Sequence, residues 1–494
     1  MDVRHSELFD VIVMGGGPGG ATVATLVALQ GHRVLLLEKE RFPRHQIGES
    51  LLPTTIHGIC GMLGARDEVM RAGFTTKLGG SFLWGSNPEP WNFSFGQSPS
   101  LTALGLTHAY QVERARFDEI LLRNASRRGV DVREGHTAVS ILTENNRACG
   151  ARFIDDQGHE RQARARFIVD ASGHRGGFHT ETGERVYSEF FRNVAVYAYF
   201  EGALRLPPPR EGNILSSAFP HGWFWFIPLS PTLTSVGAVI DRAHYDSIKS
   251  DHVDNEQLLR EMIRACPPVA RLLGNAQRVT GGIYGEVRVR MDYSYDSASF
   301  WRPGLVRIGD AACFIDPLFS SGVHLATYAA LQAARAINTV LQDRVDGARG
   351  PIDEARCFTE FEHRYRKEYR HFFDLVSAFY ELHADENSYF WVARKILATE
   401  QRETSPEAFL RLVAGASQVA HDFRPDASDT TPEEAFRAFL RATEDEKKHV
   451  ASLAFHGHRD EIEQPLLEGG LVPSLDGFHW CEPSAPSDRK ENRQ

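Results

Sequence analysis

Three glycines near the start of the chain have the spacing of a phosphate-binding turn between a strand and a helix. They follow the apolar run 9–14 and are Gly15, Gly17 and Gly20. The first glycine permits a tight turn, the second lets backbone amides approach a pyrophosphate, and the third lets the helix pack closely on the strand. A second apolar run, 33–37, leads to Glu38, whose carboxylate can accept hydrogen bonds from a ribose diol. The segment predicts a dinucleotide site.

Three later stretches indicate that the dinucleotide is FAD. They contain Arg114, the acid of Asp170-Ala171-Ser172-Gly173, and the acid of Gly309-Asp310-Ala311-Ala312. These stretches resemble the flavin-contacting motifs of the flavin monooxygenase class that includes the aromatic hydroxylases. A second glycine motif of the kind that holds NADPH is missing from the sequence. Besides the glycines and Glu38, the residues assigned to the FAD site are Arg44, Ser50, Arg114, Asp170, Gly309, Asp310 and Pro317.

Composition and charge restrict the functions open to the chain. Its 494 residues, 42% hydrophobic and 24% charged, are typical of a globular protein with two or three lobes. A net charge of −10 argues against a nucleic-acid partner, which needs a basic surface. The six cysteines lack the short spacing of a zinc or redox site, so we expect no metal. No apolar run reaches the length of a membrane span, about 18 residues, so we expect a soluble, cytoplasmic protein.

A parallel sheet is needed to bring the FAD-site residues together. Short apolar runs, several of them ending in an acid, suit strands that are buried on both faces and point into a cofactor crevice. These runs are 9–14, 33–37, 166–170 and 305–310. They predict an α/β fold with a Rossmann-like FAD-binding domain of the monooxygenase type.

The remaining patterns predict a second sheet layer and a helical lobe. Aromatic and β-branched residues alternate with polar ones in 74–110 and 185–291, which indicates antiparallel strands above the cofactor. Helical periodicity follows Ser320 and resumes near Cys357. The predicted organisation is an FAD-binding module 1–348 (FAD part about 1–73, 111–184 and 292–348; sheet layer about 74–110 and 185–291), a C-terminal helical lobe 349–481, and a flexible tail 482–494.

Two tryptophans in Trp223-Phe224-Trp225-Phe226-Ile227-Pro228 form the most specific motif of the chain. With the glycine turn, this motif resembles the flavin-dependent halogenases. The resemblance implies that the indole pair lies beside the flavin and keeps organic substrate away from it. It extends over nearly the whole chain, and its further motifs are 45–53, 320–322 and 388–391.

The resemblance also implies a chlorination mechanism. Reduced FAD (FADH2), delivered by a separate flavin reductase, and dioxygen would oxidise chloride to hypochlorous acid. The family's halide position falls on Ser320, Ser321 and Gly322, where a turn opens a helix and its amides attract an anion. The family's lysine is Lys77, which would bond hypochlorous acid or form a chloramine. Partial burial would lower the pKa of this amine. With Lys77, the predicted catalytic residues are Trp223 and Trp225.

The substrate expectation comes from one branch of the family. The chain is similar to the halogenases of glycopeptide, enediyne and chondrochloren-type pathways, which implies a tyrosyl or related phenol, chlorinated ortho to its hydroxyl and often tethered to a peptidyl carrier protein. Tryptophan halogenases have a Glu before the halide turn, whereas this chain has Phe319. The proton acceptor is left open, with Glu49 or a water as options. A basic helical face that would suit an acidic carrier, or merely be solvated, carries His363, Arg366, Lys367 and Arg370.

Two other functions fit parts of the sequence. A flavin-dependent aromatic hydroxylase has the same fold but passes oxygen to a ring, and it does not need the tryptophan pair or Lys77. A non-catalytic flavoprotein scaffold would bind FAD and form no product. The sequence favours a chlorinating enzyme over both.

Overall fold

The computed structural model describes most of the chain. The described residues are 7–84, 90–174, 176–178, 180–249, 254–291, 294–342, 352–381, 405–417 and 469–483. The motif 388–391 and most of the predicted tail lie outside these ranges. Within them, no helix is long and apolar enough to cross a membrane.

A sheet with the order β19-β20-β10-β1-β2-β7 forms the half of the molecule that contains the glycine turn. The predicted parallel pairing is found from β20 to β7, whereas β19 pairs with β20 in the antiparallel direction. Its central strand, β1, pairs in parallel with β2 and β10, so Met14 stands beside Leu37 and Asp170 at one sheet edge. The acids that end these strands therefore come together. The bounds are β1 (Glu7–Met14), β2 (Val34–Glu38), β7 (Asp131–Glu134), β10 (Glu160–Asp170), β19 (Trp301–Arg302) and β20 (Leu305–Arg307), with the hairpin of β8 (Thr137–Glu144) and β9 (Arg147–Ile154) at the side.

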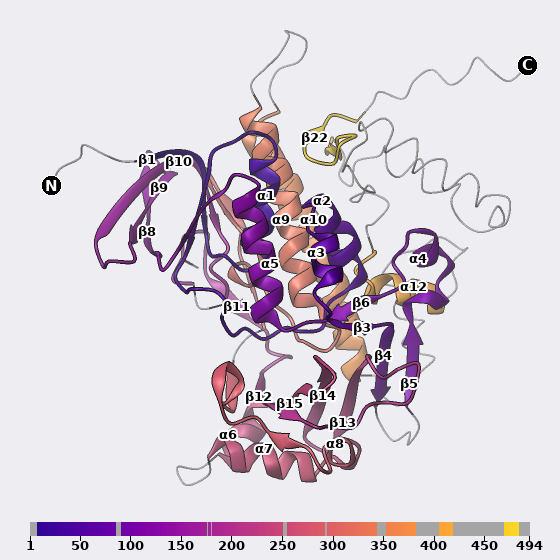
Figure 1. Ribbon diagram of the computed structural model, residues 1–494. Helices are drawn as coiled ribbons and strands as arrows, with labels where there is room; N and C mark the ends of the chain where they lie inside the picture. Colours follow the sequence, from indigo (N-terminus) through magenta and orange to yellow (C-terminus); the bar gives the residue numbers. More distant parts are fainter. Residues whose placement is uncertain are drawn as a thin grey trace, which may run out of the picture.

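A second sheet lies beneath the first in Figure 1, with the order β16-β12-β15-β14-β13-β4-β5 and with β17 beside β12. Its strands are β4 (Gly79–Leu83), β5 (Trp91–Ser94), β12 (Asn193–Glu201), β13 (Ile214–Phe219), β14 (Gly222–Pro228), β15 (Leu233–Asp241), β16 (Gln277–Arg278) and β17 (Arg288–Met291). Most pairings are antiparallel, as predicted, but β4 pairs with β13 in parallel.

The expected alternation of buried and polar residues is wrong for the middle of this second sheet. Strands β12, β14 and β15 are buried on both faces, because three helices cover the outer side. These helices fall inside the range predicted to be all strand, and they are α6 (Arg242–Ile248), α7 (Asn255–Arg264) and α8 (Pro267–Leu272).

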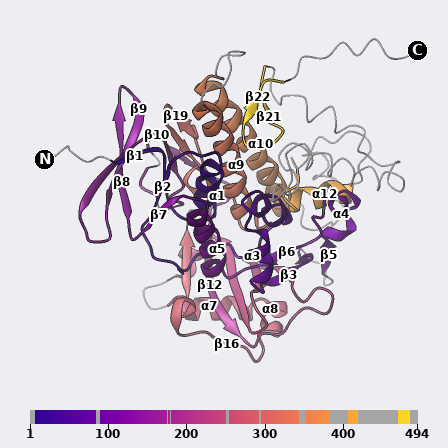
Figure 2. The same cartoon turned by 45° about the horizontal axis from the view of Figure 1, so that its top comes forward.

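Long helices join the two sheets. Helix α9 (Ser321–Leu341) runs beside α1 (Pro18–Ala28), and α10 (Glu354–Glu381) packs along α9 (Figures 1 and 2). Residues of α9 and α10 belong to the same hydrophobic core, in which Tyr328 and Phe361 are both fully buried. The other elements used below are α3 (Arg66–Arg71), β3 (Thr75–Lys77), the 3-10 turn η2 (Phe95–Gln97), β6 (Ala109–Gln111), α5 (Arg114–Arg127), β18 (Tyr295–Ser297), the 3-10 turn η4 (Gly309–Ala311) and α12 (Ser405–Val413).

Candidate active site

The glycine turn leaves an open space at the N-terminus of α1. Gly15 has a φ of +111°, and a Cβ on Gly20 would lie 1.9 Å from the Gly15 carbonyl oxygen, so neither position tolerates a side chain. At Gly17, the only atom within 4 Å of a Cβ would be Arg44 Nη2, at 3.6 Å. Because the helix dipole favours anions, this space suits a pyrophosphate.

Glu38 closes the other side of this space. Its Oε2 accepts a hydrogen bond from the Gly16 amide at 2.6 Å, and its Oε1 accepts one from the Glu40 amide at 2.9 Å. A carboxylate has about four lone-pair sites, so each oxygen keeps capacity for a ribose hydroxyl. The open turn, the helix N-terminus and this acid together fit the adenosine end of FAD.

Arg44 and Arg114 are tied to one buried acid. Asp118 accepts from Arg44 Nη1 at 2.9 Å and from both Nε and Nη2 of Arg114, at 2.7 and 2.8 Å. The remaining terminal nitrogen of Arg114 donates to the carbonyls of Ile47 and Gly48. Arg114 therefore holds the backbone strap 45–53 in place, and direct contact of Arg114 with FAD stays a prediction.

The two later acids have different surroundings. Asp170 is buried, which raises its pKa, and it accepts from the Ser172 amide at 3.1 Å. Asp310, in the turn η4 that starts at Gly309, is partly exposed and pairs with Arg290 at 3.0 Å. Of the two, Asp310 is the one whose carboxylate stays accessible to a ligand.

Lys77 ends β3 with its side chain only 3% exposed. Its Nζ donates to Ser50 Oγ at 2.8 Å and to the Leu51 carbonyl at 3.1 Å. Burial lowers the pKa of the amine to about 7. In the neutral amine, the two N–H groups donate these two hydrogen bonds, and the nitrogen lone pair can react with an electrophile. Ser50, predicted to contact FAD, thus contacts the lysine.

Aromatic rings lead from Lys77 to the turn before α9. Lys77 Nζ lies 5.9 Å from the centroid of the Phe95 ring. From there, contacts with centroid separations of 4.8 to 6.3 Å join rings of β4, β5, α10 and α12. We call these rings the aromatic cluster: Phe82, Trp84, Trp91, Phe93, Phe95, Phe319, Phe379 and Phe409. The environment of the amine is therefore mainly apolar.

The predicted tryptophans lie side by side on β14 with ring centroids 6.3 Å apart. Trp225 donates its indole N–H to Ser235 Oγ at 3.2 Å, and its ring fills the space where Gly237 lacks a side chain. Trp223 donates to the Tyr380 hydroxyl at 2.5 Å. Because its ring also lies 6.3 Å from that of Trp84, Trp223 touches the aromatic cluster.

The residues predicted to bind halide lie in the turn that starts α9, and their binding of an anion stays a prediction. The Pro317 carbonyl accepts a hydrogen bond from the Ser320 amide. Ser320 adopts a left-handed φ of +59°, and its side chain makes no hydrogen bond to the first amides of the helix. A Cβ on Gly322 would lie 2.7 Å from the Phe314 ring, so this position needs glycine. The turn thus presents uncapped amides of Ser321 and Gly322.

Comparison with known proteins identifies the family. Residues 10–106 and 97–425 match the model of the tryptophan halogenase family. The chain is 36% identical over 394 residues to the tryptophan 2-halogenase of Chondromyces crocatus, covering 79% of this chain and 71% of the relative. It is 32% identical over 376 residues to the flavin-dependent halogenase gsfI of Penicillium aethiopicum, covering 71% and 67%. The chain belongs to the flavin-dependent halogenases.

The solved structures agree with this assignment. The myxobacterial chondrochloren halogenase CndH, described as a new variant of FAD-dependent halogenases, is 52% identical, with a TM-score of 0.75 over 96% of this chain and 100% of that chain. Enzymes of the family use FAD with chloride and dioxygen and generally need a partner flavin reductase. This halogenase is accordingly an FAD-dependent oxidoreductase.

The structure shows the surroundings of two further residues that the sequence singled out in this halogenase. Glu49, one option for the proton acceptor, is buried, which raises its pKa to about 7, and its Oε2 has no hydrogen-bond partner among the described residues, although Ser235 and Tyr199 of the second sheet lie nearby. It therefore faces the Trp225 side of the strap. On the basic face of α10, Arg366 is committed to Asp296 at 3.0 Å and to Glu362 at 2.7 Å, so it is not available to a partner.

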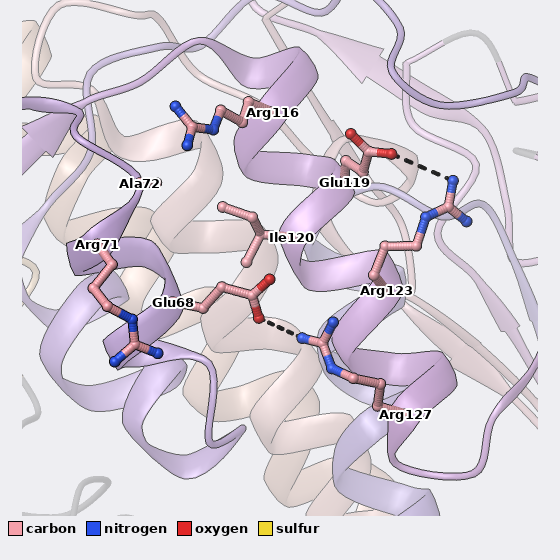
Figure 3. A pocket seen from close by; sticks show the side chains of 8 residues that line it. All are labelled: Glu68, Arg71, Ala72, Arg116, Glu119, Ile120, Arg123 and Arg127. Carbon is pink, nitrogen blue, oxygen red and sulfur yellow. Dashed lines mark hydrogen bonds and ion pairs between the residues drawn. The ribbon is translucent and has the colours of Figure 1, made fainter.

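An arginine-rich groove of about 360 Å³ lies between α3 and α5 (Figure 3). Arg127 pairs with Glu68, and Arg123 pairs with Glu119 across one turn of α5. Both pairs are drawn in Figure 3, where Ile120 lies between the helices. None of the residues predicted for the active site lines this groove, whose lining is Glu68, Arg71, Ala72, Arg116, Glu119, Ile120, Arg123 and Arg127.

Proposed function

We propose that this halogenase chlorinates a phenolic ring, tyrosyl in type, at the position ortho to the hydroxyl, while the substrate is tethered to a peptidyl carrier protein. The observation that carries the proposal is the Lys77 amine, buried, held by two acceptors and adjacent to the aromatic cluster. Such an amine can place one electrophilic chlorine beside one ring.

Different residues are assigned to the cofactor and to the halide that the cofactor must oxidise. FAD would be held by the glycine turn, Glu38 and Asp310, and when bound and reduced it supplies, with dioxygen, the oxidising power that turns chloride into hypochlorous acid. The amides of Ser321 and Gly322 bind chloride, because the helix dipole and the missing cap favour an anion. Trp223 and Trp225 fill the space on β14 and keep the organic substrate away from the flavin, where the oxidant forms.

Lys77 then receives the chlorine. Its neutral lone pair attacks the chlorine of hypochlorous acid; an N–Cl bond forms, the Cl–O bond breaks, and the displaced hydroxide takes one amine proton to leave as water. The phenol ring next attacks the chlorine, the N–Cl bond breaks, and the ring proton returns to the nitrogen. Because Ser50 and Leu51 fix the amine, the reacting carbon is selected by position.

Phe319 supports a phenolic substrate. It occupies the place before the halide turn where tryptophan halogenases have an acid, and its ring packs on Phe82 and Phe379 at 5.7 and 5.1 Å. A phenol activates its own ortho carbon and needs no acid at this position. The 52% identity to the chondrochloren halogenase favours the same branch. A carrier protein would use the basic face of α10. Because Arg366 is paired with acids of this chain, that face consists of His363, Lys367 and Arg370.

Free tryptophan is the second candidate substrate. The Chondromyces relative with 36% identity carries the name tryptophan 2-halogenase. An indole substrate would need a carboxylate near the halide turn, and position 319 does not provide one.

A product assay decides between these substrates. The enzyme is incubated with FAD, a generic flavin reductase, NADH and chloride, together with free tyrosine, carrier-tethered tyrosine and free tryptophan, and products are read by mass. We expect the mass shift of one chlorine on the tethered phenol, and parallel reactions with bromide test the halide. Chlorotryptophan as the main product would refute the phenol proposal. A hydroxylated product without halide, or no product at all, would indicate the hydroxylase or the scaffold instead.

A further inference from the structure

Three segments of the active site meet at the hydroxyl of Tyr380, near the end of α10. Trp223 of β14 donates its indole N–H to this oxygen at 2.5 Å. The hydroxyl donates in turn to Asp316 Oδ2 at 3.1 Å. Asn193 of β12 also donates to Asp316 Oδ2, at 3.1 Å. The aromatic rings of Phe191 and Trp84 lie beside Tyr380, at 5.5 and 5.9 Å.

The direction of these hydrogen bonds follows from the groups themselves. An indole nitrogen only donates, and an ionised carboxylate only accepts, so the Tyr380 hydroxyl must accept from Trp223 and donate to Asp316. A phenylalanine would leave a buried donor and a buried acceptor each short of a partner, which is costly in a low-dielectric interior. No other described side chain donates to Asp316 Oδ2 except Asn193.

Asp316 connects this pair to the proposed halide turn. It is fully buried, and its Oδ1 accepts from the Leu318 amide at 3.0 Å. Leu318 lies two residues before Ser320, whose left-handed backbone starts α9. A non-glycine residue in this conformation persists only when its surroundings fix it. The carboxylate of Asp316 therefore helps to fix the backbone from which the first amides of α9 project.

We propose that Tyr380 is a positioning residue that couples the tryptophan pair to the halide turn. The inference rests on the proposed halide site at Ser321 and Gly322. The residues assigned to FAD and to the halide do not include Tyr380; it holds Trp223 in place on one side and Asp316, with the loop that leads to α9, on the other. Helix α10 is thereby part of the proposed halogenation site.

Coupling of this kind is reciprocal. If Tyr380 links the halide turn to Trp223, the hydrogen bond of Trp223 affects halide binding. By linkage, halide binding must affect that hydrogen bond with the same coupling free energy. This consequence is measurable on the indole itself and does not require turnover.

The test combines an indole signal with halide kinetics, both on the FAD-loaded enzyme. Each of the seven tryptophans gives one signal after ¹⁵N-indole labelling, and Trp223→Phe assigns the relevant one. In Tyr380→Phe we expect the Trp223 N–H proton signal to move upfield and its response to added chloride to vanish. We also expect the KM for chloride to rise about tenfold, as for loss of one hydrogen bond to a charged group, while kcat at saturating chloride changes less.

Two control variants separate the possible failures. Tyr369→Phe removes a hydroxyl from the same helix, 11 residues earlier, and should leave the Trp223 signal and the chloride KM unchanged. Gly322→Ala forces a Cβ toward Phe314 and reports on the halide turn directly. If Tyr380→Phe does not fold, Asn193→Leu, which removes the second donor to Asp316, should raise the chloride KM in the same direction.

Each outcome bears on a different statement. An unmoved Trp223 signal in Tyr380→Phe would overturn the inference. Suppose that Tyr380→Phe moves the Trp223 signal but leaves the chloride KM unchanged, while Gly322→Ala raises the chloride KM. This result would overturn the coupling and support the halide site. An unchanged KM in both variants would show that the proposed halide site is wrong, and the coupling to it would fail with it.

Discussion

The nucleotide end and the lysine end of this active site are assembled from differently distributed residues. The nucleotide end lies almost entirely between residues 15 and 38, and its working groups are backbone amides and one acid. The lysine end draws on β3, the strap 45–53, the turn before α9, and helices α10 and α12, and its surroundings are aromatic. On the proposed assignment, a local polar motif binds the cofactor, whereas the oxidant reaches an apolar space built by tertiary contacts.

The difference has a chemical reason. A pyrophosphate is an anion that a helix N-terminus and a glycine turn can bind wherever they occur. Electrophilic chlorine reacts with many groups, so its acceptor must be a single nucleophile among side chains that keep water and other amines away. Burial also lowers the pKa of Lys77 to about 7, which makes that nucleophile available near neutral pH. The three predictions below test this division.

The largest effect should come from Lys77→Met. We expect chlorinated product to fall at least about 100-fold, because the proposed acceptor of chlorine is removed. FAD binding should not change, and hypochlorous acid should still appear in solution, where a trapping reagent measures it. The free energy of unfolding should rise by about 1 kcal/mol or more, because methionine replaces a buried amine. Lys39→Met, at an exposed lysine, is the matched control; product formation that survives Lys77→Met would remove Lys77 from the mechanism.

The pH dependence should reveal the same lysine. The amine is reactive only when neutral, so the chlorination rate should fall about tenfold per pH unit below about 7 and level off above it. The folded pKa of about 7 lies below the usual 10.5, so between these values the unfolded chain binds more protons and the free energy of unfolding rises with pH. Rates and denaturant unfolding across pH 6–10 measure both. A stability slope that persists in Lys77→Met would assign the titration to another group.

The smallest effect should come from the nucleotide end. In Glu38→Gln we expect the Kd for FAD to rise about fivefold, because one of the acid's oxygens becomes a donor and can no longer accept from both an amide and a ribose hydroxyl. The chloride KM should stay unchanged, since no described contact joins Glu38 to the aromatic cluster. FAD fluorescence titration gives the Kd, and the exposed Glu40→Gln serves as the control. A chloride KM that rose with the FAD Kd would show that the two ends are not independent.

Much of the fold and part of the site could be predicted from the sequence. The glycine turn, β1, β2 and α9 were predicted within a few residues of their observed bounds, because their patterns are local. The helices α6 to α8 were missed although α7 has a local signal, an Asp254 N-cap followed by a buried apolar face. The parallel pairing of β4 with β13 was not predicted, since pairing between distant strands leaves no local signal. Tyr380 was missed for the same reason: it is one of 13 tyrosines, and nothing in its neighbours indicates Trp223 or Asp316 as partners.

The sequence by itself determined that a dinucleotide is bound and that a tryptophan pair stands on a strand, because short motifs encode a turn, a helix start and a strand through steric rules that act within a few residues. Only the tertiary structure decided that Ser50 binds Lys77, that Arg114 holds the strap, and that Tyr380 joins Trp223 to Asp316. Burial, hydrogen-bond direction and pKa depend on which distant atoms surround a group. These surroundings exist only once the sheets and helices have packed.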